Sequence, residues 1–295
     1  VDESFLSHRL PLAQVARELG AEVVVAGGDT GKSDVIRELG FNYVPLPISR
    51  AGTNIVQELR LIRLLLSLYR NVAPDLVHLV STKPVIYGSI AAQLVGGFPV
   101  VNTINGLGYV FASNNRGRWL RGAVCMLYRL ALRYPFSLTI FQNPDDRALF
   151  IQSGLIQPER AVLIRGSGVD CHRFHPAPEP MEPPVVMLPS RLLWDKGVGD
   201  FVEAARIARR TNPKIRWVLV GAPDPGNPST VSESDIQRWV EQGLVEWWGH
   251  RTDMPEVLSS AHIVVLPSYR EGLPKVLLEA AACGRPLVAT DVPGC

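Results

Sequence analysis

Two glutamates near the end of the sequence, Glu271 and Glu279, have the type and spacing of a sugar-binding pair. Glu271 lies in the loop after a strand expected over 263–266, and Glu279 lies in a helix expected over 275–281. Their eight-residue spacing is slightly over two helical turns, so both side chains are expected to point toward one side. Carboxylates accept hydrogen bonds from neighbouring hydroxyl groups, which suits ribose and hexose.

The loop between these glutamates has the glycine turn of an anion-binding site. Gly272, Leu273 and Pro274 join the strand to the helix. Backbone N–H groups and the positive end of the helix dipole face whatever binds above such a turn. Because glycine has no side chain, a ligand can approach the backbone closely. The turn therefore predicts bound phosphate groups beside the carboxylates.

A second loop supplies positive charge. Arg191 and Lys196 flank the turn between a strand expected over 185–189 and a helix that starts near residue 200. Two cations there could neutralise a diphosphate without a metal ion, each charge-assisted hydrogen bond contributing about 1.5–3 kcal/mol. Such cations are often ordinary surface charges, so the prediction depends on both loops occurring in one chain.

The order of the segments indicates an α/β fold with parallel sheets, because short β-branched runs alternate with helix-like segments. Strands are expected over 22–26, 76–80, 100–104, 138–141 and 161–164, and then over 185–188, 217–220, 245–248, 263–266 and 287–289. Ligands of such sheets bind beyond the carboxyl ends of the strands, where both charged loops lie.

A proline-rich segment at 176–184 divides the 295 residues into two expected domains, 1–178 and 179–295. Its five prolines disfavour both helix and sheet, as a linker requires. Both ends look cut, because a helix-like stretch at 12–19 precedes any strand and the chain stops just past the last strand. We expect the first strand of the first domain to be missing and the second domain to be incomplete.

The composition restricts the class of protein further. With 46% hydrophobic and 20% charged residues the chain reads as globular, and no apolar run approaches the length of a membrane span. The four cysteines are scattered, which argues against a zinc site or a disulfide framework. A cytoplasmic protein without a metal site is therefore expected.

The positive charge is concentrated in the first half. Residues 1–178 carry 18 Lys or Arg against 13 Asp or Glu, a charge of +5, whereas 179–295 carry 12 against 15, a charge of −3. Much of the excess lies in a basic amphipathic helix, with Leu127 and Leu130 on its apolar side and the basic residues Arg116, Arg118, Arg121, Arg129 and Arg133. This helix either packs on a sheet with a solvated face or docks on an anionic membrane, where each basic residue contributes about 1 kcal/mol. Nucleic acid is not expected as a partner, because interleaved aromatic residues are lacking.

The two charged loops together resemble the retaining glycosyltransferases of family four, which have the GT-B fold of two Rossmann-like domains. The resemblance is carried by the segments SRLLWDKG at 190–197 and EGLPKVLLE at 271–279. It extends along nearly the whole chain. Four further segments resemble the branch that extends lipid-linked sugars in capsule, exopolysaccharide or glycan assembly, at 5–12, 74–78, 82–84 and 106–111.

The resemblance implies roles for the residues of both loops. Glu279 matches the glutamate that holds the ribose hydroxyls, and Glu271 the one that contacts the donor hexose. Arg191 and Lys196 match the diphosphate clamp that stabilises the leaving group, so the expected catalytic residues are Glu271, Lys196 and Arg191. The turn at Gly272, Leu273 and Pro274 would face the sugar and the phosphates. Residues 1–178 would bind the acceptor and 179–295 the nucleotide sugar.

One position departs from the pattern of many relatives, which have a histidine before the glycine of a first-domain loop. This chain has Asn105 there, and asparagine cannot act as a general base at neutral pH. The candidates for contacts with the acceptor or the sugar are His8, His78, Lys83, Asn105 and Gly106, although a histidine at a strand end is more often structural. Gly221 and His250 stand at strand ends where the nucleobase lies in the family.

The sequence thus predicts an enzyme that moves a hexose or N-acetylhexosamine from a nucleotide, expected to be UDP, to a hydroxyl of a lipid-linked saccharide with retention of configuration. The nucleotide sugar is a substrate, and no cofactor or obligatory metal is expected. Two alternatives are a sugar-nucleotide epimerase of the same fold, for which no acid and base residues stand out, and a non-catalytic sugar-nucleotide-binding scaffold. The enzyme is expected in the cytoplasm, peripheral on the inner face of the membrane.

Overall fold

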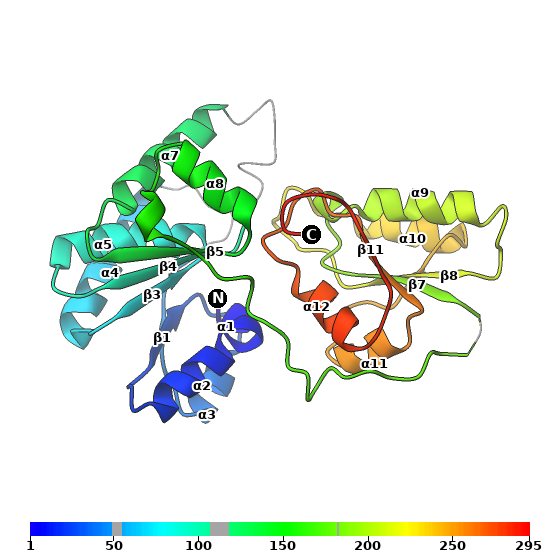
Figure 1. Ribbon diagram of the computed structural model, residues 1–295, viewed down its shortest axis with the longest axis horizontal. Coiled ribbons are helices and arrows are strands. Elements are labelled where there is room, and N and C mark those ends of the chain that lie inside the picture. Colours follow the sequence, from blue (N-terminus) through cyan, green and yellow to red (C-terminus); the bar gives the residue numbers. More distant parts are fainter. Residues whose placement is uncertain (49–54, 107–117, 182) are drawn as a thin grey trace. The chain divides into compact units, whose positions relative to one another are not determined.

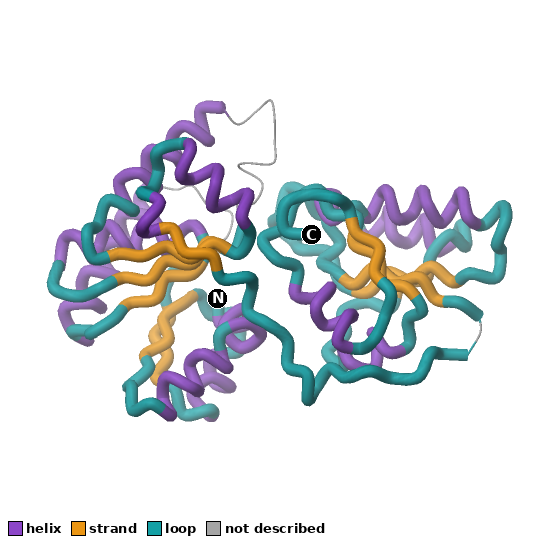
Figure 2. The backbone as a smooth tube through the Cα atoms, viewed as in Figure 1, coloured by secondary structure: helices purple, strands orange, loops and turns teal. Residues whose placement is uncertain are grey.

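The computed structural model divides into two compact units that contain parallel sheets and helices (Figure 1). It describes residues 1–48, 55–106, 118–181 and 183–295. The first unit comprises Val1–Ile104, Gly122–Ile140 and Phe150–Val162, and the second comprises Asn105–Arg121, Phe141–Leu149 and Leu163–Cys295. The α/β fold class predicted from the sequence is confirmed, as the alternation of strands and helices in Figure 2 shows.

The strands of the first half form two parallel sheets. One pairs β1 (Val24–Gly27) with β2 (Asn42–Pro45). The other has the order β3-β4-β5-β6, with β3 (Val77–Val80), β4 (Val100–Ile104), β5 (Ser137–Phe141) and β6 (Ala161–Leu163). Strand β2 was not predicted, because its four residues include asparagine and proline, which are depleted in strands.

Helices separate these strands along the chain, as a parallel arrangement requires. They are α1 (Asp2–His8), α2 (Leu10–Glu18), α3 (Ser33–Glu38), α4 (Ile55–Val72), the π-helical turn η1 (Pro84–Gly88), α5 (Ser89–Val95), α7 (Arg118–Ala131), α8 (Pro144–Gln152) and the 3₁₀ turn η2 (Pro158–Arg160). Helix α4 buries Leu61, Leu65 and Tyr69 and packs on α5 and η1. A separate core of Ala13, Ile36, Phe41 and Tyr43 joins α2 and α3 to β2.

The second unit is built on one five-stranded parallel sheet with the order β11-β10-β7-β8-β9. Its strands are β7 (Val185–Pro189), β8 (Arg216–Val220), β9 (Glu246–Trp247), β10 (Ile263–Leu266) and β11 (Leu287–Ala289). Every residue of the central strand β7 is buried. A wholly apolar strand buried on both faces is typical of the middle of a parallel sheet.

Helices cover both faces of this sheet (Figure 1). The 3₁₀ turn η3 (Trp194–Lys196), α9 (Val198–Ala208) and α10 (Glu233–Glu241) lie on one side, where Phe201, Leu219 and Ile236 belong to one core. Helices α11 (Met254–Ser259) and α12 (Lys275–Ala282) lie on the other, where Val257 and Ala280 belong to a second core. Two cores hold the sheet rigid, which fixes the positions of the loops that follow its strands.

The proline-rich segment after residue 175 is attached to the second unit. Phe174, just before it, is buried in the core with α11 and α12. The buried guanidinium of Arg285 donates hydrogen bonds to the carbonyl oxygens of Ala177 at 2.7 Å and Pro178 at 2.8 Å. By their contacts the residues from Leu163 onward group with the second unit. The functional boundary at residue 178 stays a prediction.

Candidate functional site

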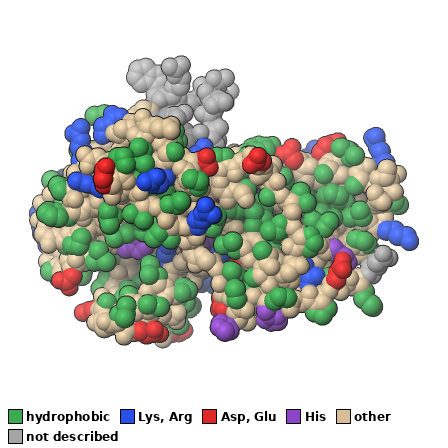
Figure 3. Space-filling view, viewed as in Figure 1, with side chains coloured by type: hydrophobic (Ala, Val, Ile, Leu, Met, Phe, Trp, Pro, Cys, Tyr) green, Lys and Arg blue, Asp and Glu red, His purple; other side chains and the backbone are tan. Residues whose placement is uncertain are grey.

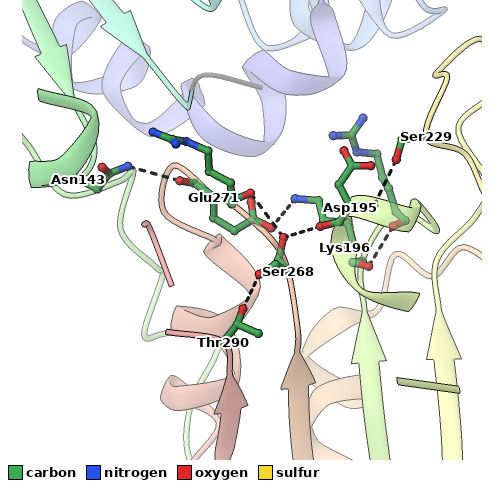
Figure 4. Close-up of polar contacts among 10 residues, drawn as sticks. Asn143, Asp195, Lys196, Ser229, Ser268, Glu271 and Thr290 are labelled. Carbon is green, nitrogen blue, oxygen red and sulfur yellow. Dashed lines mark hydrogen bonds and ion pairs between the residues drawn. The ribbon is translucent and has the colours of Figure 1, made fainter. Parts of the chain in front are cut away.

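The predicted donor-binding residues other than Glu279 lie in the loops and turns at the carboxyl end of the second unit's sheet, where Figure 4 shows Lys196 and Glu271. Strand β7 leads into the loop of Arg191 and Lys196, and β10 leads into the loop of Glu271. Because β7 and β10 pair in parallel, their carboxyl ends lie at the same edge of the sheet. The structure therefore brings together two loops that are 75 residues apart in the sequence.

Lys196 and Glu271 form an ion pair at the centre of this site. The Lys196 Nζ lies 2.5 Å from the Glu271 Oε1, and the two side chains are only 19% and 11% exposed. Charges this far from solvent interact strongly and are costly to leave without a counter-charge. The pair lies at a place where a phosphate could take the lysine as partner and a sugar hydroxyl could take the glutamate.

Arg191 makes a second ion pair at the more exposed side of the site. Its Nη1 lies 2.5 Å from the Asp224 Oδ2, with side chains 54% and 19% exposed. Asp224 was not among the residues predicted from the sequence. The feature that could have indicated Asp224 is its position in the glycine-containing loop after β8, the strand that pairs with β7. The loop is ordered by the Asp224 backbone N–H, which donates to the Thr230 Oγ1 at 2.9 Å.

Glu279 lies on α12 and has a lysine one helical turn before it. The Lys275 Nζ is 3.3 Å from the Glu279 Oε1, and the glutamate side chain is 13% exposed. This spacing places both residues on one face of the helix. All four charged residues predicted for the donor, Arg191, Lys196, Glu271 and Glu279, are thus in ion pairs between described residues.

Gly272 allows another backbone segment to approach closely. In this structure that segment is the one around Asn105. A Cβ atom at this position would lie 1.8 Å from the Asn105 carbonyl oxygen. A Cβ at Gly106 would lie 3.2 Å from the Gly272 nitrogen. The structure therefore places the predicted Asn105 and Gly106 against the Gly272 turn, with Leu273 and Pro274 following at the start of α12.

Two residues that the sequence analysis missed hold this turn. Asn143 caps α8 by accepting a hydrogen bond from the Asp146 backbone N–H at 2.8 Å, and its Nδ2 donates to the Gly272 carbonyl oxygen at 2.9 Å. Asp146, which is 1% exposed, forms an ion pair with Arg270. The Asn-Pro-Asp-Asp pattern at 143–146 is typical of a helix start, but nothing local indicated that it meets a loop 129 residues away.

The ends of β8 and β9 are tied together at the predicted nucleobase residues. The Gly221 N–H donates to the Gly249 carbonyl oxygen at 2.8 Å, and the Trp247 Nε1 donates to the Gly221 carbonyl oxygen at 2.8 Å. A Cβ at Gly221 would lie 1.9 Å from the Ser190 carbonyl oxygen, so a larger residue would displace the Arg191 loop. His250 follows Gly249 and is exposed.

The candidate residues of the first unit are each engaged within that unit. The His8 Nδ1 lies 2.6 Å from the Ser7 Oγ, and the Lys83 Nζ lies 2.6 Å from the Glu58 Oε1. The His78 Nε2 lies 2.8 Å from the Thr103 Oγ1. Burial, with a smaller contribution from the Arg9 charge, lowers the pKa of His78 to about 4. His78 is therefore neutral at pH 7, as a structural histidine would be.

The basic helix predicted over 116–133 is described only in part. Helix α7 begins at Arg118, but Arg116 and the side chains of Arg118 and Arg121 lie outside the described residues. Arg129 is exposed and donates to the Ser153 carbonyl oxygen at 3.4 Å, and Arg133 is also exposed. The apolar side is incompletely buried, because Leu130 remains 47% exposed.

No cluster of three or more His, Cys, Asp or Glu side chains arranged to hold a metal ion occurs in the described parts of the chain. Among the helices that the structure describes, none is both long and apolar enough to span a bilayer.

Two family models match the chain. Residues 1–143 match the model for glycosyl transferase 4-like proteins, and residues 183–295 match the model for glycosyl transferases group 1. The second match contains both charged loops of the site. The first contains His8, Lys83, Asn105 and Gly106.

Curated relatives and solved structures agree with these matches. The chain is 28% identical to an N,N'-diacetylbacillosaminyl-diphospho-undecaprenol α-1,3-N-acetylgalactosaminyltransferase of Campylobacter jejuni, over 99% of this chain and 81% of the relative. It is 27% identical to a UDP-Gal:α-D-GlcNAc-diphosphoundecaprenol α-1,3-galactosyltransferase of Escherichia coli, over 84% of this chain and 66% of the relative. Anabaena HepE in complex with UDP and glucose has a similar fold, with a TM-score of 0.71 at 21% identity over 97% of this chain and 77% of that one. The chain thus belongs to the family-four glycosyltransferases with the GT-B fold.

Proposed function

We propose that this chain transfers a hexose or an N-acetylhexosamine from UDP to a hydroxyl group of a lipid-linked saccharide, with retention of configuration. The observation that carries the proposal is the partly buried Lys196–Glu271 pair at the carboxyl end of β7 and β10. The Campylobacter and E. coli relatives both act on sugars carried by diphospho-undecaprenol and form α-1,3 linkages, which supports the acceptor class. The UDP sugar of the second relative and the UDP bound to HepE support the nucleotide.

In the proposed reaction the bond between C1 of the sugar and the phosphate oxygen breaks, and its electron pair leaves with UDP. Lys196 and Arg191 stabilise the negative charge that grows on the diphosphate. Glu271 contacts the transferred sugar, and Glu279 holds the ribose hydroxyls. The acceptor oxygen bonds to C1 on the face from which UDP departs, and the acceptor proton passes to the departing phosphate. No metal ion is needed in this scheme.

Binding of the donor requires an exchange of partners at the site. In the structure Lys196 pairs with Glu271, and Arg191 pairs with Asp224. A diphosphate carries more negative charge than a carboxylate and can accept hydrogen bonds from both cations. Once Lys196 turns to phosphate, Glu271 can accept a hydrogen bond from a sugar hydroxyl. The site thus keeps its buried charges compensated at every stage.

Calorimetric titration of the chain with UDP, GDP and NAD tests this proposal. We expect selective binding of UDP, which Lys196→Ala and Glu279→Ala both abolish or weaken strongly. Lys214→Ala is the matched control, because Lys214 is an exposed cation at the opposite, amino end of β8. A folded chain that binds NAD in preference to UDP, or that binds UDP equally well in all variants, contradicts the proposal. Transfer from UDP-hexoses to a lipid-linked saccharide then tests the chemistry.

We further propose that the first unit contacts an anionic membrane, where a lipid-linked acceptor resides, from the cytoplasmic side. The support is the surface of α7 and the neighbouring α5. Met126 is 71% exposed, Leu130 47% and Leu94 64%, and the basic Arg129 and Arg133 are exposed beside them. Figure 3 shows Lys and Arg side chains among hydrophobic ones on the first unit. Apolar side chains framed by basic ones are typical of interfacial helices.

Sedimentation with phosphatidylglycerol vesicles tests the membrane contact, with phosphatidylcholine vesicles as the neutral comparison. We expect binding to the anionic vesicles only. Charge reversal at Arg129→Glu and Arg133→Glu should weaken it about tenfold or more, since each basic residue contributes about 1 kcal/mol. Reversal of two exposed cations of the second unit, Arg210→Glu and Lys214→Glu, is the control. Equal losses in both double variants would show a nonspecific charge effect and contradict the proposed surface.

A further inference from the structure

Ser268 lies between the loop of Lys196 and the loop of Glu271 (Figure 4). The residue is fully buried, with 0% of its surface exposed. Its Oγ donates a hydrogen bond to the Asp195 carbonyl oxygen at 3.1 Å and lies 3.5 Å from the Arg270 carbonyl oxygen. Asp195 and Arg270 directly precede Lys196 and Glu271 in the sequence. The Ser268 hydroxyl thus contacts the peptide units that directly precede Lys196 and Glu271, the two members of the ion pair.

The backbones of the two loops also touch next to Ser268. Gly197 has a φ of +72°, and a Cβ atom there would lie 2.1 Å from the Pro267 carbonyl oxygen. The Tyr269 backbone N–H donates to the same Asp195 carbonyl oxygen at 3.0 Å. The contact therefore continues over three successive residues of the β10 loop. Neither loop can shift along the other without breaking it.

The rest of Ser268 is fixed by the last strand of the sheet. Its carbonyl oxygen accepts a hydrogen bond from the hydroxyl of Thr290, the residue after β11. The Glu271 backbone N–H donates to the Pro293 carbonyl oxygen at 3.0 Å, so the chain after β11 also supports Glu271. The Ser268 hydroxyl is consequently held by rigid parts of the second unit while it points at the Lys196 turn.

We propose that Ser268 is a positioning residue of the donor site, whose hydroxyl keeps the Lys196 turn in register with Glu271 so that both side chains meet one nucleoside diphosphate sugar. This inference rests on the proposed function. Ser268 acts through Lys196 and does not contact the donor itself. Its effect therefore depends on the lysine being present, which distinguishes positioning from a general contribution to folding.

Ser268→Ala is a clean test of this role. The substitution removes a donor and leaves the Asp195 carbonyl oxygen with its hydrogen bond from the Tyr269 N–H, so no buried acceptor loses its last partner. The variant is expected to fold. Ser260→Ala is the matched control, because the Ser260 Oγ also donates to a backbone carbonyl, that of Val257 at 2.7 Å, at the end of α11.

The experiment measures UDP and UMP affinity by calorimetry for the wild type and for Ser268→Ala, Ser260→Ala, Lys196→Ala and the Ser268→Ala/Lys196→Ala double variant. We expect Ser268→Ala to weaken UDP binding about fivefold, the effect of one ordinary hydrogen bond, and to change UMP binding much less. In the Lys196→Ala background the serine substitution should have almost no effect, since coupled residues are non-additive. Ser268→Cys, which keeps a weak donor, should lie between wild type and alanine.

Each outcome decides one of the two proposals. A wild-type chain that binds no UDP overturns the proposed function and this inference with it. Wild-type binding of UDP that Ser268→Ala leaves unchanged overturns the inference alone. The inference is also overturned if Ser268→Ala weakens UDP binding equally in the wild type and in the Lys196→Ala background. It is overturned as well if Ser260→Ala weakens UDP binding as much as Ser268→Ala does. Should Ser268→Ala fail to fold, Ser268→Cys with the same cycle gives the answer.

Discussion

The candidate residues of the two units are held in different ways. In the second unit the ion pair of Lys196 and Glu271 joins loops far apart in the sequence, and both side chains are largely buried. In the first unit His8 contacts its neighbour Ser7, and His78 is kept neutral by burial next to Thr103. The second unit thus holds two charged groups, Lys196 and Glu271, where a ligand could bind to them. In the first unit, burial disfavours the charged form of His78.

The two kinds of contact differ in what they indicate about chemistry. A buried pair of opposite charges is costly to assemble and gains little stability, so its presence in a loop at the carboxyl end of a parallel sheet indicates a functional reason. A buried neutral histidine bonded to a hydroxyl needs no such reason. The contrast supports the assignment of the donor to the second unit more directly than any assignment to His78.

The largest effect is expected from a side chain added where the loops of Lys196 and Glu271 touch. Gly197 and Gly168 share a φ of +72°, but a Cβ at Gly197 would lie 2.1 Å from a backbone carbonyl oxygen whereas nothing lies within 4 Å of one at Gly168. We expect Gly197→Ala to lower the free energy of unfolding by more than about 3 kcal/mol. Gly168→Ala, the control for the positive φ, should cost about 1–2 kcal/mol.

Urea unfolding followed by tryptophan fluorescence and circular dichroism measures both changes. Five of the six tryptophans lie after residue 178, so fluorescence reports mainly on the second unit. Equal losses of unfolding free energy in the two variants would show that the loops of Lys196 and Glu271 can move apart at little cost. The close contact at Gly197 would then not support a site shared by the two loops.

The neutral state of His78 predicts how stability depends on pH. Its pKa falls from the ordinary 6.5 to about 4 in the folded chain, because burial disfavours the charged form. Between these values the unfolded chain binds a proton that the folded chain does not, so stability is complete above about pH 6.5 and decreases as the pH falls toward 4. The loss should reach at most about 3 kcal/mol, at roughly 1.4 kcal/mol per unit of pKa.

Thermal unfolding from pH 7 to pH 4 checks this for the wild type and for His78→Gln. The glutamine variant should lose the part of the pH dependence that comes from His78, at the cost of lower stability at pH 7. His172→Gln, at an exposed position, is the control. A wild type and a His78→Gln variant with the same slope would mean that His78 is accessible to protons, and would reopen it as a candidate for acceptor contacts.

Much of the fold could be predicted from the sequence, because strongly apolar strands separated by helices leave few alternatives. Strands β4, β10 and β11 begin and end where the sequence predicted, whereas β2 was missed because its composition is atypical of strands. The sequence gives no distances between segments. It could not show that the helix start at Asn143 meets the Gly272 turn, or that the Leu130 side of α7 stays exposed.

The two cations of the proposed clamp differ in their exposure to solvent. The Lys196 side chain is 19% exposed and that of Arg191 is 54% exposed, so a phosphate interacts with the lysine at a lower effective dielectric constant. We expect Lys196→Met to weaken UDP binding about thirtyfold, the size of a buried charge-assisted hydrogen bond. Arg191→Met should weaken it about fivefold, as for an exposed ion pair. Calorimetry at two salt concentrations measures both, and a larger loss at Arg191 would contradict the ranking by burial.

The sequence could predict the residues of the candidate site whose own side chains have a charge suited to the ligand. It could not predict a residue that acts through a neighbouring residue. Arg191, Lys196, Glu271 and Glu279 stand out because they lie in, or in the helix directly after, glycine-containing loops that follow strands, where ligands of parallel sheets bind. Ser268 does not stand out, because a serine after a strand is common and only its 3.1 Å hydrogen bond to the Asp195 carbonyl gives it significance. Side chains that support other residues become visible only in three dimensions.

Asp224 is expected to have the smallest effect, and with the opposite sign. Its carboxylate pairs with Arg191 and must compete with a phosphate for the same guanidinium. Asp224→Asn removes the negative charge but keeps an oxygen that can accept the arginine's hydrogen bond, so Arg191 stays in place. We expect UDP to bind about threefold more tightly, since an exposed ion pair contributes at most about 1 kcal/mol. The gain should shrink in high salt, which screens the competing charge.

Asp235→Asn is the matched control for this prediction, because Asp235 also pairs with an exposed arginine, Arg238, but on α10 and away from the loops. It should leave UDP binding unchanged. Weaker binding in Asp224→Asn would mean that the carboxylate orients Arg191 for the diphosphate and does not compete with it. In that case Asp224 would be a positioning residue that acts through Arg191, as proposed for Ser268 acting through Lys196. The buried Ser268 and the less buried Asp224 would then have the same role, so burial alone would not distinguish positioning residues from residues that contact the donor.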